Sequence, residues 1–233
     1  MSDLLQGLRQ AVQLLVGGDA ETWQIIGLSL EVSCLALLIS TVLGIPLGAF
    51  LGLRSFRGRG LTIALVYTGM GLPPVVAGLL VYLLLSRAGP LGVLGWLFTP
   101  RAMVVAQALI SLPVIAGLTM AGVQSIDPAL RLQIRSLGAT SAQVRRALLW
   151  EARTSIVVAV VAGFGSIISE VGAVMLVGGN IQGSTRVLTT AIVLETRTGA
   201  FDQALALAFV LLLLVFVINA LLLRLQGHLQ MPH

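Results

Sequence analysis

Five long apolar windows are the feature that most constrains what this chain can fold into. A helix that crosses a lipid bilayer needs about 20 consecutive, mostly apolar residues. Windows of that length cover residues 23–53, 61–86, 102–126, 154–178 and 204–223. Hydrophobic residues make up 57% of the chain and charged residues only 10%, a composition typical of integral membrane proteins. We therefore predict an all-α integral membrane protein with about five transmembrane helices.

The charges in the connecting loops predict how the chain is oriented in the membrane. All 14 basic residues are Arg, and nine of them follow the first, third and fifth windows. Short loops rich in basic residues are retained in the cytoplasm. The predicted topology therefore has the N-terminus outside, the C-terminus inside and the polar segment 127–150 in the cytoplasm. The net charge of +5 reflects this asymmetry, so we do not expect nucleic-acid binding.

The two ends of the chain lie outside the predicted membrane domain. Residues 2–16 alternate apolar and polar side chains with a helical period. This pattern predicts that segment 1–22 contains an amphipathic helix lying in the outer membrane interface, in contact with lipid. A sixth span is the less favoured alternative, because the polar face is extensive. We expect residues 226–233 to form a short cytoplasmic tail.

The polar segment 127–150 carries the signals of two short helices joined at an angle. Asp127 is a good N-cap for the first helix. Gly138 suits the left-handed residue that ends a helix. Thr140 and Gln143 have the spacing of a capping box that begins a second helix.

The surface of this segment resembles a docking site for another protein. Apolar positions repeat at helical spacing on both predicted helices, and Arg side chains flank them. The apolar positions are Leu130, Ile134, Leu137, Val144 and Leu148, and the flanking residues are Arg131, Arg135, Arg145 and Arg146.

Prolines interrupt two of the apolar windows. Pro73 and Pro74 lie in the second window, and Pro113 lies in the third. A proline at membrane depth frees a backbone carbonyl, which is tolerated only where protein or a water-filled cavity receives it. We expect broken helices there, serving either as walls of a translocation path or as fixed kinks.

An acidic residue inside the fourth window is the other unusual polar group. A carboxylate at membrane depth is costly and usually faces the interior of the bundle or an aqueous cavity. The predicted partner of Glu170 is an Arg or a hydroxyl such as that of Ser166. Both a structural role and a role in the path or gate remain open for it.

Glycines four residues apart mark one face of the first window. They are Gly44, Gly48 and Gly52. Small residues at this spacing allow two helices to approach closely in lipid. We expect this face to pack against another span.

The residues needed for catalysis or for binding ATP are absent from the sequence. A chain without Lys cannot contain the phosphate-binding motif G-x-x-x-x-G-K-[ST]. The one Cys lies far in sequence from the two His residues near the C-terminus, which argues against a metal site. The chain is therefore expected to be non-enzymatic, to bind no cofactor and to conduct a solute. A stand-alone channel or secondary transporter is a remote alternative to a permease driven by another subunit.

Part of the polar segment resembles the cytoplasmic coupling loop of type I ABC importer permeases. The run RSLGAT at 135–140 carries the likeness, although LQI at 132–134 stands where that family has Glu-Ala-Ala. In that family the loop rests in a groove of the ATPase subunit. The resemblance therefore implies a coupling role for Leu130, Ile134, Arg135, Ser136, Leu137, Gly138, Ala139, Val144 and Arg145.

A second stretch resembles the molybdate/tungstate branch of these permeases. The elements SEVGA at 169–173 and GNIQG at 179–183 are similar to Gly-Glu-Phe-Gly-Ala and Gly-Asn-Ile-Pro-Gly in that branch. Ser169, Val171 and Gln182 are the departures. The run at 186–192 and the amphipathic N-terminal segment look most like the tungstate-specific permeases.

The resemblance implies the fold, the partners and the location of the chain. Residues 23–225 would form a type I permease domain that pairs with a second copy of itself. Two copies of an ABC ATPase, using ATP and Mg, and an extracytoplasmic oxyanion-binding protein would complete the importer. It would lie in the cytoplasmic (inner) membrane of a prokaryote and import tungstate by alternating access, with molybdate, sulfate or phosphate as alternatives. Pro73, Pro74, Pro113, Ser166 and Glu170 are the candidate path or gate residues.

Overall fold

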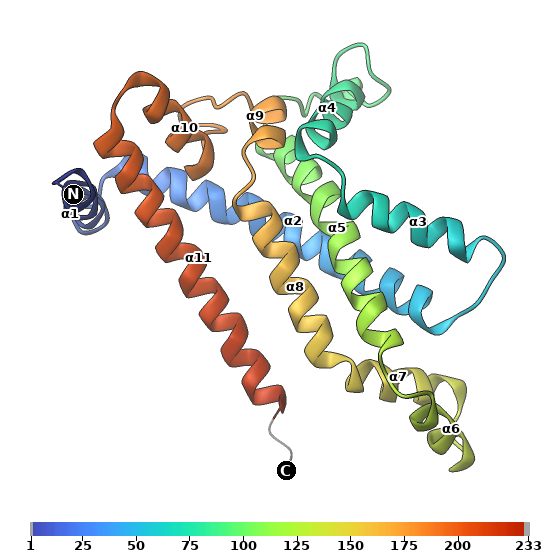
Figure 1. Ribbon diagram of the computed structural model, residues 1–233. Coiled ribbons are helices and arrows are strands. Elements are labelled where there is room, and N and C mark those ends of the chain that lie inside the picture. The colour runs from blue at the N-terminus through green and yellow to red at the C-terminus, as the bar shows by residue number, and fades with distance from the viewer. Residues whose placement is uncertain (1, 231–233) are drawn as a thin grey trace.

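The computed structural model describes residues 2–230, and this part of the chain is helical without any strand (Figure 1). The helices are α1 (Ser2–Val16), α2 (Ala20–Leu53), α3 (Arg59–Met70), α4 (Pro74–Leu85), the short 3-10 helix η1 (Gly92–Leu94), α5 (Pro100–Gln124), α6 (Pro128–Ser136), α7 (Ser141–Glu151), α8 (Arg153–Ile168), α9 (Gly172–Gly178), α10 (Leu188–Thr198) and α11 (Phe201–Gln230).

The described residues contain three helices that are long and apolar enough to cross a membrane, namely α2, α5 and the Phe201–Leu222 part of α11. The number rises to five if the bent pairs α3–α4 and α7–α8 each count as one span. The all-α class and the membrane-spanning character are confirmed. Figure 1 places α6, α7 and the end of α11 at one end of the bundle, and α4, α9 and α10 at the other. Which end faces the cytoplasm stays a prediction.

The second window is two helices set at a steep angle. The α3 and α4 axes differ by 104°, and the chain turns between Met70 and Pro74. A proline lacks a backbone N–H and disfavours helical geometry in the residue before it, so the pair Pro73-Pro74 stops α3 and restarts the chain as α4. The predicted break is confirmed here.

The third window does not break, so the predicted interruption at Pro113 was wrong. Helix α5 runs without interruption from Pro100 to Gln124 with Pro113 buried inside it. A Cβ on Gly69 of α3 would lie only 2.8 Å from the Pro113 Cβ, so the end of α3 packs directly on the proline ring. One proline removes one ladder hydrogen bond, and close packing by neighbouring helices keeps the rest of the helix intact.

The fourth window breaks where the sequence predicted a continuous span. Helix α8 ends at Ile168 and α9 begins at Gly172, so residues 169–171 are non-helical. The prediction of a single helix over 154–178 was therefore wrong. Apolar length alone does not reveal a break that tertiary contacts stabilise.

Helix α5 is the central element against which the others pack. The α2 glycines Gly44, Gly48 and Gly52 face it, as the four-residue spacing predicted. A Cβ at Gly48 would lie 2.3 Å from the Ala116 carbonyl oxygen and 2.8 Å from the Thr119 Cβ. The two backbones are thus nearly in contact, which maximises dispersion between helices in lipid.

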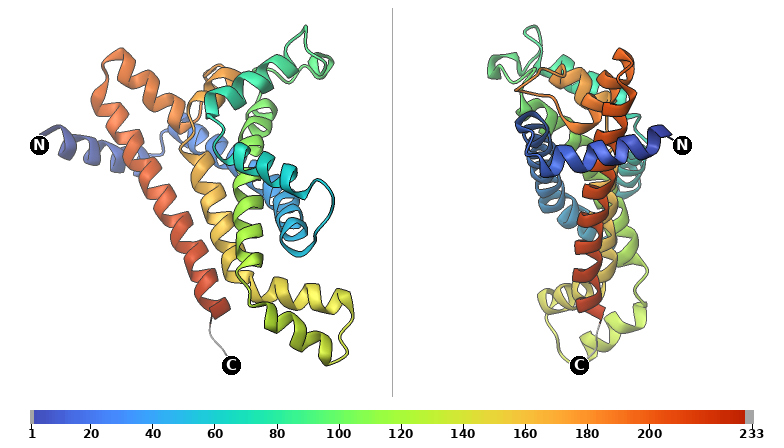
Figure 2. Two further views of the ribbon diagram at one scale, coloured as in Figure 1. Left: turned by 45° about the vertical axis from the view of Figure 1, so that its right-hand side comes forward. Right: turned by 90° about the vertical axis from the view of Figure 1, so that its left-hand side faces the viewer.

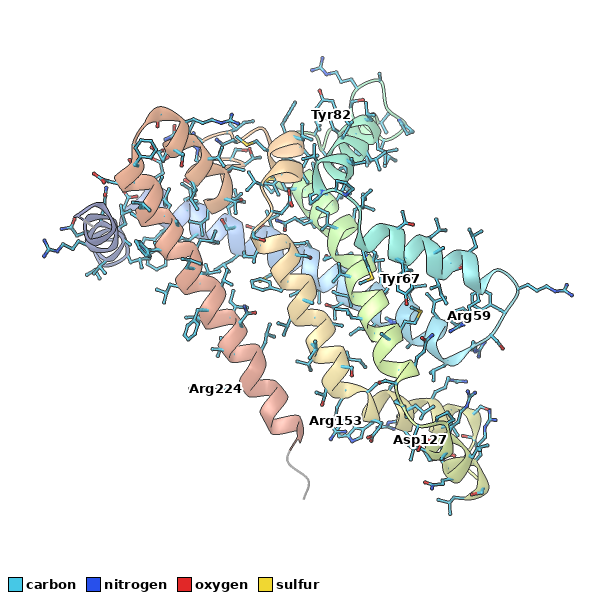
Figure 3. All side chains as sticks on the ribbon, in the orientation of Figure 1. Arg59, Tyr67, Tyr82, Asp127, Arg153 and Arg224 are labelled. Carbon is cyan, nitrogen blue, oxygen red and sulfur yellow. The ribbon has the colours of Figure 1, made fainter. Side chains whose placement is uncertain are left out.

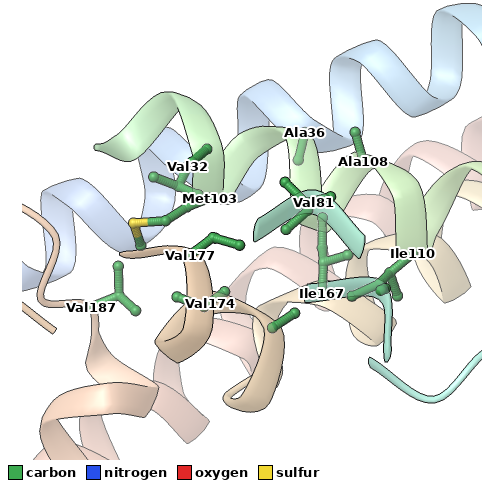
Figure 4. Close-up of a cluster of buried hydrophobic side chains, with 14 of the residues drawn as sticks. Val32, Ala36, Val81, Met103, Ala108, Ile110, Ile167, Val174, Val177 and Val187 are labelled. Atoms are coloured by element: carbon green, nitrogen blue, oxygen red, sulfur yellow. The ribbon is translucent and has the colours of Figure 1, made fainter. Parts of the chain in front are cut away.

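Buried apolar side chains from five helices meet in one cluster. Figure 4 shows Val32 of α2, Val81 of α4, Met103 of α5, Ile167 of α8 and Val174 of α9 in one cluster. Each of these side chains is at most 2% exposed. This cluster fixes the short helices α4 and α9 to the long ones.

The N-terminal segment is helical, as predicted, and packs on the last helix. A Cβ on Gly7 of α1 would lie 2.8 Å from the Leu205 Cβ of α11. Ala11 of α1 is buried in a cluster with apolar residues of α2, α10 and α11. Figure 2 shows α1 crossing beside α11 rather than running along it. Residues 226–230 of the predicted tail continue α11, and residues 231–233 lie outside the described part.

Asp19 caps the start of α2 outside the apolar window. Its Oδ2 accepts hydrogen bonds from the Thr22 hydroxyl at 2.5 Å and the Thr22 backbone N–H at 2.8 Å. These two bonds hold the pKa of Asp19 below its ordinary value. The cap therefore stabilises the helix while Asp19 is ionised, and the contribution is lost as the pH falls through the lowered pKa.

The close approach of α2 and α5 predicts a position-specific effect of adding one methyl group. Gly48→Ala should lower the free energy of unfolding by about 1–3 kcal/mol, because the new Cβ would overlap the α5 backbone. The matched control is Gly27→Ala on the same helix, where a Cβ meets no atom within 4 Å. That control should be neutral or slightly stabilising. Thermal unfolding of the purified variants in detergent measures both, and equal effects would contradict this packing.

Candidate functional site

The α6–α7 hairpin is the first candidate site, and its local structure follows the sequence signals. The Asp127 Oδ1 accepts a hydrogen bond from the Ala129 backbone N–H at 2.8 Å and caps α6. Gly138 ends α6 with φ +83°, a left-handed conformation that favours glycine. At the start of α7, the Thr140 N–H donates to Gln143 Oε1 at 2.8 Å, and the Gln143 N–H donates to Thr140 Oγ1 at 3.4 Å. The N-cap, the stop and the capping box are confirmed.

The apolar side chains of the hairpin divide between its outer surface and the protein interior. Leu137 at the tip is 87% exposed, whereas Val144 and its neighbour Leu148 on α7 are 3% and 4% exposed. Two exposed apolar residues that the sequence reasoning did not select are Leu132 and Trp150. The outward apolar surface is thus formed by α6 and the hairpin tip together with Trp150, while the α7 ridge anchors the hairpin to the rest of the chain.

The other predicted coupling residues lie around that tip. Leu130, Ile134 and Ala139 are partly buried, whereas Arg135, Ser136, Gly138 and Arg145 are exposed. The Ser136 hydroxyl donates to the Gln133 carbonyl at 2.8 Å, within α6. Arg153, labelled in Figure 3 at the base of the hairpin, holds Trp150 in place. Its Nη1 donates to the Trp150 carbonyl at 2.9 Å, and its guanidinium lies 5.1 Å from the centre of the indole ring.

The second candidate site is the place where the two helix breaks meet. A Cβ on Gly78 of α4 would lie 2.6 Å from the Ala173 Cα of α9. A Cβ on Gly172 would lie 2.8 Å from a methyl carbon of Val75, next to the Pro73-Pro74 turn. The first turns of α4 and α9, which begin at separate breaks, are therefore packed side by side.

The Glu170 carboxylate lies inside this junction and caps α9. Its Oε1 accepts a hydrogen bond from the Ala173 backbone N–H at 2.9 Å. The predicted partners, an Arg or a side-chain hydroxyl, were wrong. A new helix start exposes backbone N–H groups that have no intrahelical acceptor, and the nearest carboxylate satisfies one of them.

Two side chains that the sequence reasoning missed complete the hydrogen bonding of the break. The Gln107 amide of α5 donates to the Ile167 carbonyl at 3.2 Å, and the Thr189 hydroxyl of α10 donates to the Glu170 carbonyl at 2.9 Å. The Gln107 Oε1 is buried and has no hydrogen-bond partner among the described residues. The available signal was an amide inside an apolar window, because polar side chains at membrane depth usually bond to neighbouring helices.

The structure separates the remaining predicted path residues. Pro73 and Pro74 lie at the junction with Glu170, and Pro113 packs on Gly69 near the end of α3. The Ser166 hydroxyl donates to the Gly163 carbonyl of its own helix at 2.7 Å. Ser166 therefore contributes to α8 rather than to the binding of the Glu170 carboxylate.

The chain turns sharply after α9. Gly179 and Asn180 both have positive φ, +75° and +52°. The Thr185 hydroxyl donates to the Gly178 carbonyl at 2.6 Å and closes the turn. Gln182 then reaches the start of α2, where its amide donates to Glu21 Oε1 at 2.8 Å.

Comparison with known sequences identifies the family. The sequence model of a family described as "Binding-protein-dependent transport system inner membrane component" matches residues 44–231. The chain belongs to this family. It is a multi-pass membrane protein of the permease type, and its resemblance to importer permeases is confirmed.

Individual relatives of this permease cover almost its whole length. It is 42% identical to the tungstate uptake system permease protein TupB of Peptoclostridium acidaminophilum over 97% of this chain and 99% of that protein. It is 44% identical to a probable anion ABC transporter permease protein of Haloferax volcanii over 84% of this chain and 87% of that protein.

Solved structures confirm the fold. A structure of the MetNI methionine ABC transporter in an inward-facing conformation matches with a TM-score of 0.74 at 20% identity. The match covers 94% of this chain and 97% of that one. This permease therefore has the fold of ABC importer permeases.

The capping role of Glu170 predicts a graded response to substitution. Glu170→Ala should lower the free energy of unfolding by about 1–2 kcal/mol, since it leaves a buried N–H without an acceptor. Glu170→Gln should cost less, because the amide oxygen can still accept from Ala173. Glu31→Ala, at an exposed acidic residue of α2, is the control and should have little effect. Unfolding in detergent measures the three, and an unchanged Glu170→Ala protein would rule out the cap.

Proposed function

We propose that this chain is the permease subunit of an ABC importer that moves tungstate into the cytoplasm. The observation that carries the proposal is the 42% identity to a tungstate uptake permease along nearly the full length of both chains. The non-catalytic character of the chain supports it, because the sequence offers no nucleotide-binding motif and the work of transport must come from another subunit.

The proposed assembly is a homodimer of this permease with two ATPase subunits and an extracytoplasmic oxyanion-binding protein, in the inner membrane of a prokaryote. Closed symmetry of this kind is the common solution for subunits that enclose a shared path. The α6–α7 hairpin supplies the ATPase contact. Its exposed apolar surface, which includes Leu132 of α6 and Leu137 at the tip, has the composition of the centre of a protein interface.

The mechanism we propose is alternating access driven through the hairpin. ATP binding closes the ATPase dimer and moves the hairpin, which continues directly into α8 through Ala152. The displacement reaches the junction of the two breaks, where short helices can rotate without unwinding a long span. ATP hydrolysis reverses the motion.

The junction supports this role because Gln107, Glu170 and Thr189 bond to backbone groups at the break between α8 and α9. The Glu170 carboxylate accepts from the Ala173 N–H in the first turn of α9, so that donor is not available to a passing anion. A dianion that crosses a bilayer needs hydrogen-bond donors along its path to offset lost hydration. In this proposal the junction acts as a hinge beside the path.

The first test concerns the hairpin. Leu137→Asp should reduce retention of the ATPase on an affinity-tagged permease by about tenfold, since a charge replaces an apolar contact residue. Gly138→Pro should abolish ATP-driven uptake, because proline cannot adopt a φ of +83°. Val93→Asp is the control, since Val93 is 95% exposed and lies in the loop between α4 and α5. Wild-type uptake by either hairpin variant in proteoliposomes would refute the coupling role.

The second test concerns the substrate. Proteoliposomes that contain the permease, its ATPase and its binding protein should take up tungstate only with ATP inside. Elemental analysis of the vesicles for tungsten, molybdenum and sulfur should find at least about tenfold preference for tungstate over molybdate and sulfate at equal concentration, about 1.4 kcal/mol. Equal uptake of molybdate would be consistent with an ATP-driven importer but would contradict the preference for tungstate. Flux through the permease alone without ATP would instead identify a channel or secondary transporter.

A further inference from the structure

A pocket lined by four arginines lies between the end of α2 and the α6–α7 hairpin. Its volume is about 200 Å³. The guanidinium-bearing residues are Arg54 from the end of α2, Arg131 and Arg135 from α6, and Arg145 from α7. We call this the arginine pocket. It brings together arginines that are up to 91 residues apart in sequence, 54 to 145. The Arg54 guanidinium also lies 5.6 Å from the centre of the Phe50 ring.

The arginine pocket lies on one face of α7, and the outward apolar surface that includes Trp150 lies on the opposite face. Ser141, Val144, Arg145 and Leu148 line the pocket, with the spacing of one helical face. Gln143, Arg146, Ala147 and Trp150 line a separate hollow on the other face of the helix. Arg145 and Arg146 are therefore neighbours in sequence that point into different environments. The pocket faces the permease's own α2, and the other hollow faces outward.

None of the described residues that line the arginine pocket carries a carboxylate. The salt bridge found in the described part of the chain joins Arg186 to Glu21, and those residues lie beside the turn after α9, at the other end of the bundle. The Arg131 Nε is buried and has no hydrogen-bond partner in the described structure. Like charges held together repel, and a buried donor without an acceptor is costly. Both costs disappear if an anion occupies the pocket.

The chemistry of the donors defines the anion. A guanidinium group presents N–H donors in a planar fork that matches two oxygens of a phosphate-like group. The volume is roughly six to seven times the ~30 Å³ share of one water molecule, which suits one small anion with a few waters. We propose that the arginine pocket binds a tetrahedral oxyanion group, either a free oxyanion or the phosphodiester of an anionic lipid headgroup.

This site goes beyond the proposed transport function and does not depend on the transported solute. The pocket lies beside the hairpin, at the end of the bundle that the loop charges predict to be cytoplasmic. An anion held between Arg54 and Arg145 would tie the end of α2 to the hairpin. Phosphodiester headgroups and free oxyanions are both available at that surface.

The experiment compares Arg145→Gln with Arg146→Gln. The two residues are adjacent on α7, but Arg145 lines the arginine pocket and Arg146 lines the hollow on the opposite face. The full chain, with and without its ATPase, is placed in phosphatidylcholine nanodiscs and titrated calorimetrically with sodium tungstate and with inorganic phosphate. In a parallel arm, nanodiscs also contain phosphatidylglycerol, and native mass spectrometry counts the lipids retained by the protein.

The proposal expects Arg145→Gln to weaken the binding of one probe by about tenfold or more, the loss of one charge-assisted contact. Arg146→Gln should match the wild type. Arg145→Lys should bind more weakly than wild type, because it keeps the charge and loses the fork. Binding of tungstate or phosphate identifies a free-oxyanion site, and retention of phosphatidylglycerol alone identifies a lipid headgroup site. Both arginines are exposed, so their melting temperatures should remain unchanged.

Three results would overturn the proposal. The first is that neither probe anion nor phosphatidylglycerol is retained. The second is equal loss of binding in Arg145→Gln and Arg146→Gln, which indicates unspecific charge attraction. The third is loss of the ATPase from Arg145→Gln without any anion binding, which assigns the arginines to acidic residues of that subunit. Failure of ATP-driven tungstate uptake would reject the proposed function and leave this measurement on the chain intact.

Discussion

The pairing of backbone polar groups at the two helix breaks is the constraint on which the rest of this structure depends. Within a bilayer no water is available to a free N–H or C=O group, so a helix can end there only where protein groups take over. Gln107, Glu170 and Thr189 do this for the break between α8 and α9. Gln107 belongs to α5, Glu170 lies in the break itself, and Thr189 belongs to α10. The break therefore exists only because the surrounding helices are assembled.

Close packing on α5 makes that assembly possible. The glycines of α2 bring two backbones nearly into contact, and Gly78 does the same for α4 and α9. These contacts replace the hydrophobic driving force that is missing between helices in lipid. The same packing keeps α5 continuous through Pro113, so a residue that breaks isolated helices does not end the helix here.

The local features of the α6–α7 hairpin could be predicted from neighbouring residues. An N-cap, a left-handed glycine and a capping box each depend on residues within about four positions of one another. Which face of the hairpin points inward could not be predicted in the same way. Val144 looked like part of an outward ridge but is buried, whereas Trp150 is exposed. Which side of a short amphipathic helix turns inward depends on where α2 ends, and helical spacing contains no information about that.

The sequence by itself determined the helical class, the membrane-spanning character, the family and the positions of the local caps, because these depend on composition and short-range chemistry. Only the tertiary structure decided that α8 breaks at Glu170, that this carboxylate bonds to a backbone N–H, and that Arg54 joins the arginines of the hairpin. Each of these depends on groups far apart along the chain. Their meeting is set by how closely small residues let the helices approach, which no single apolar window records.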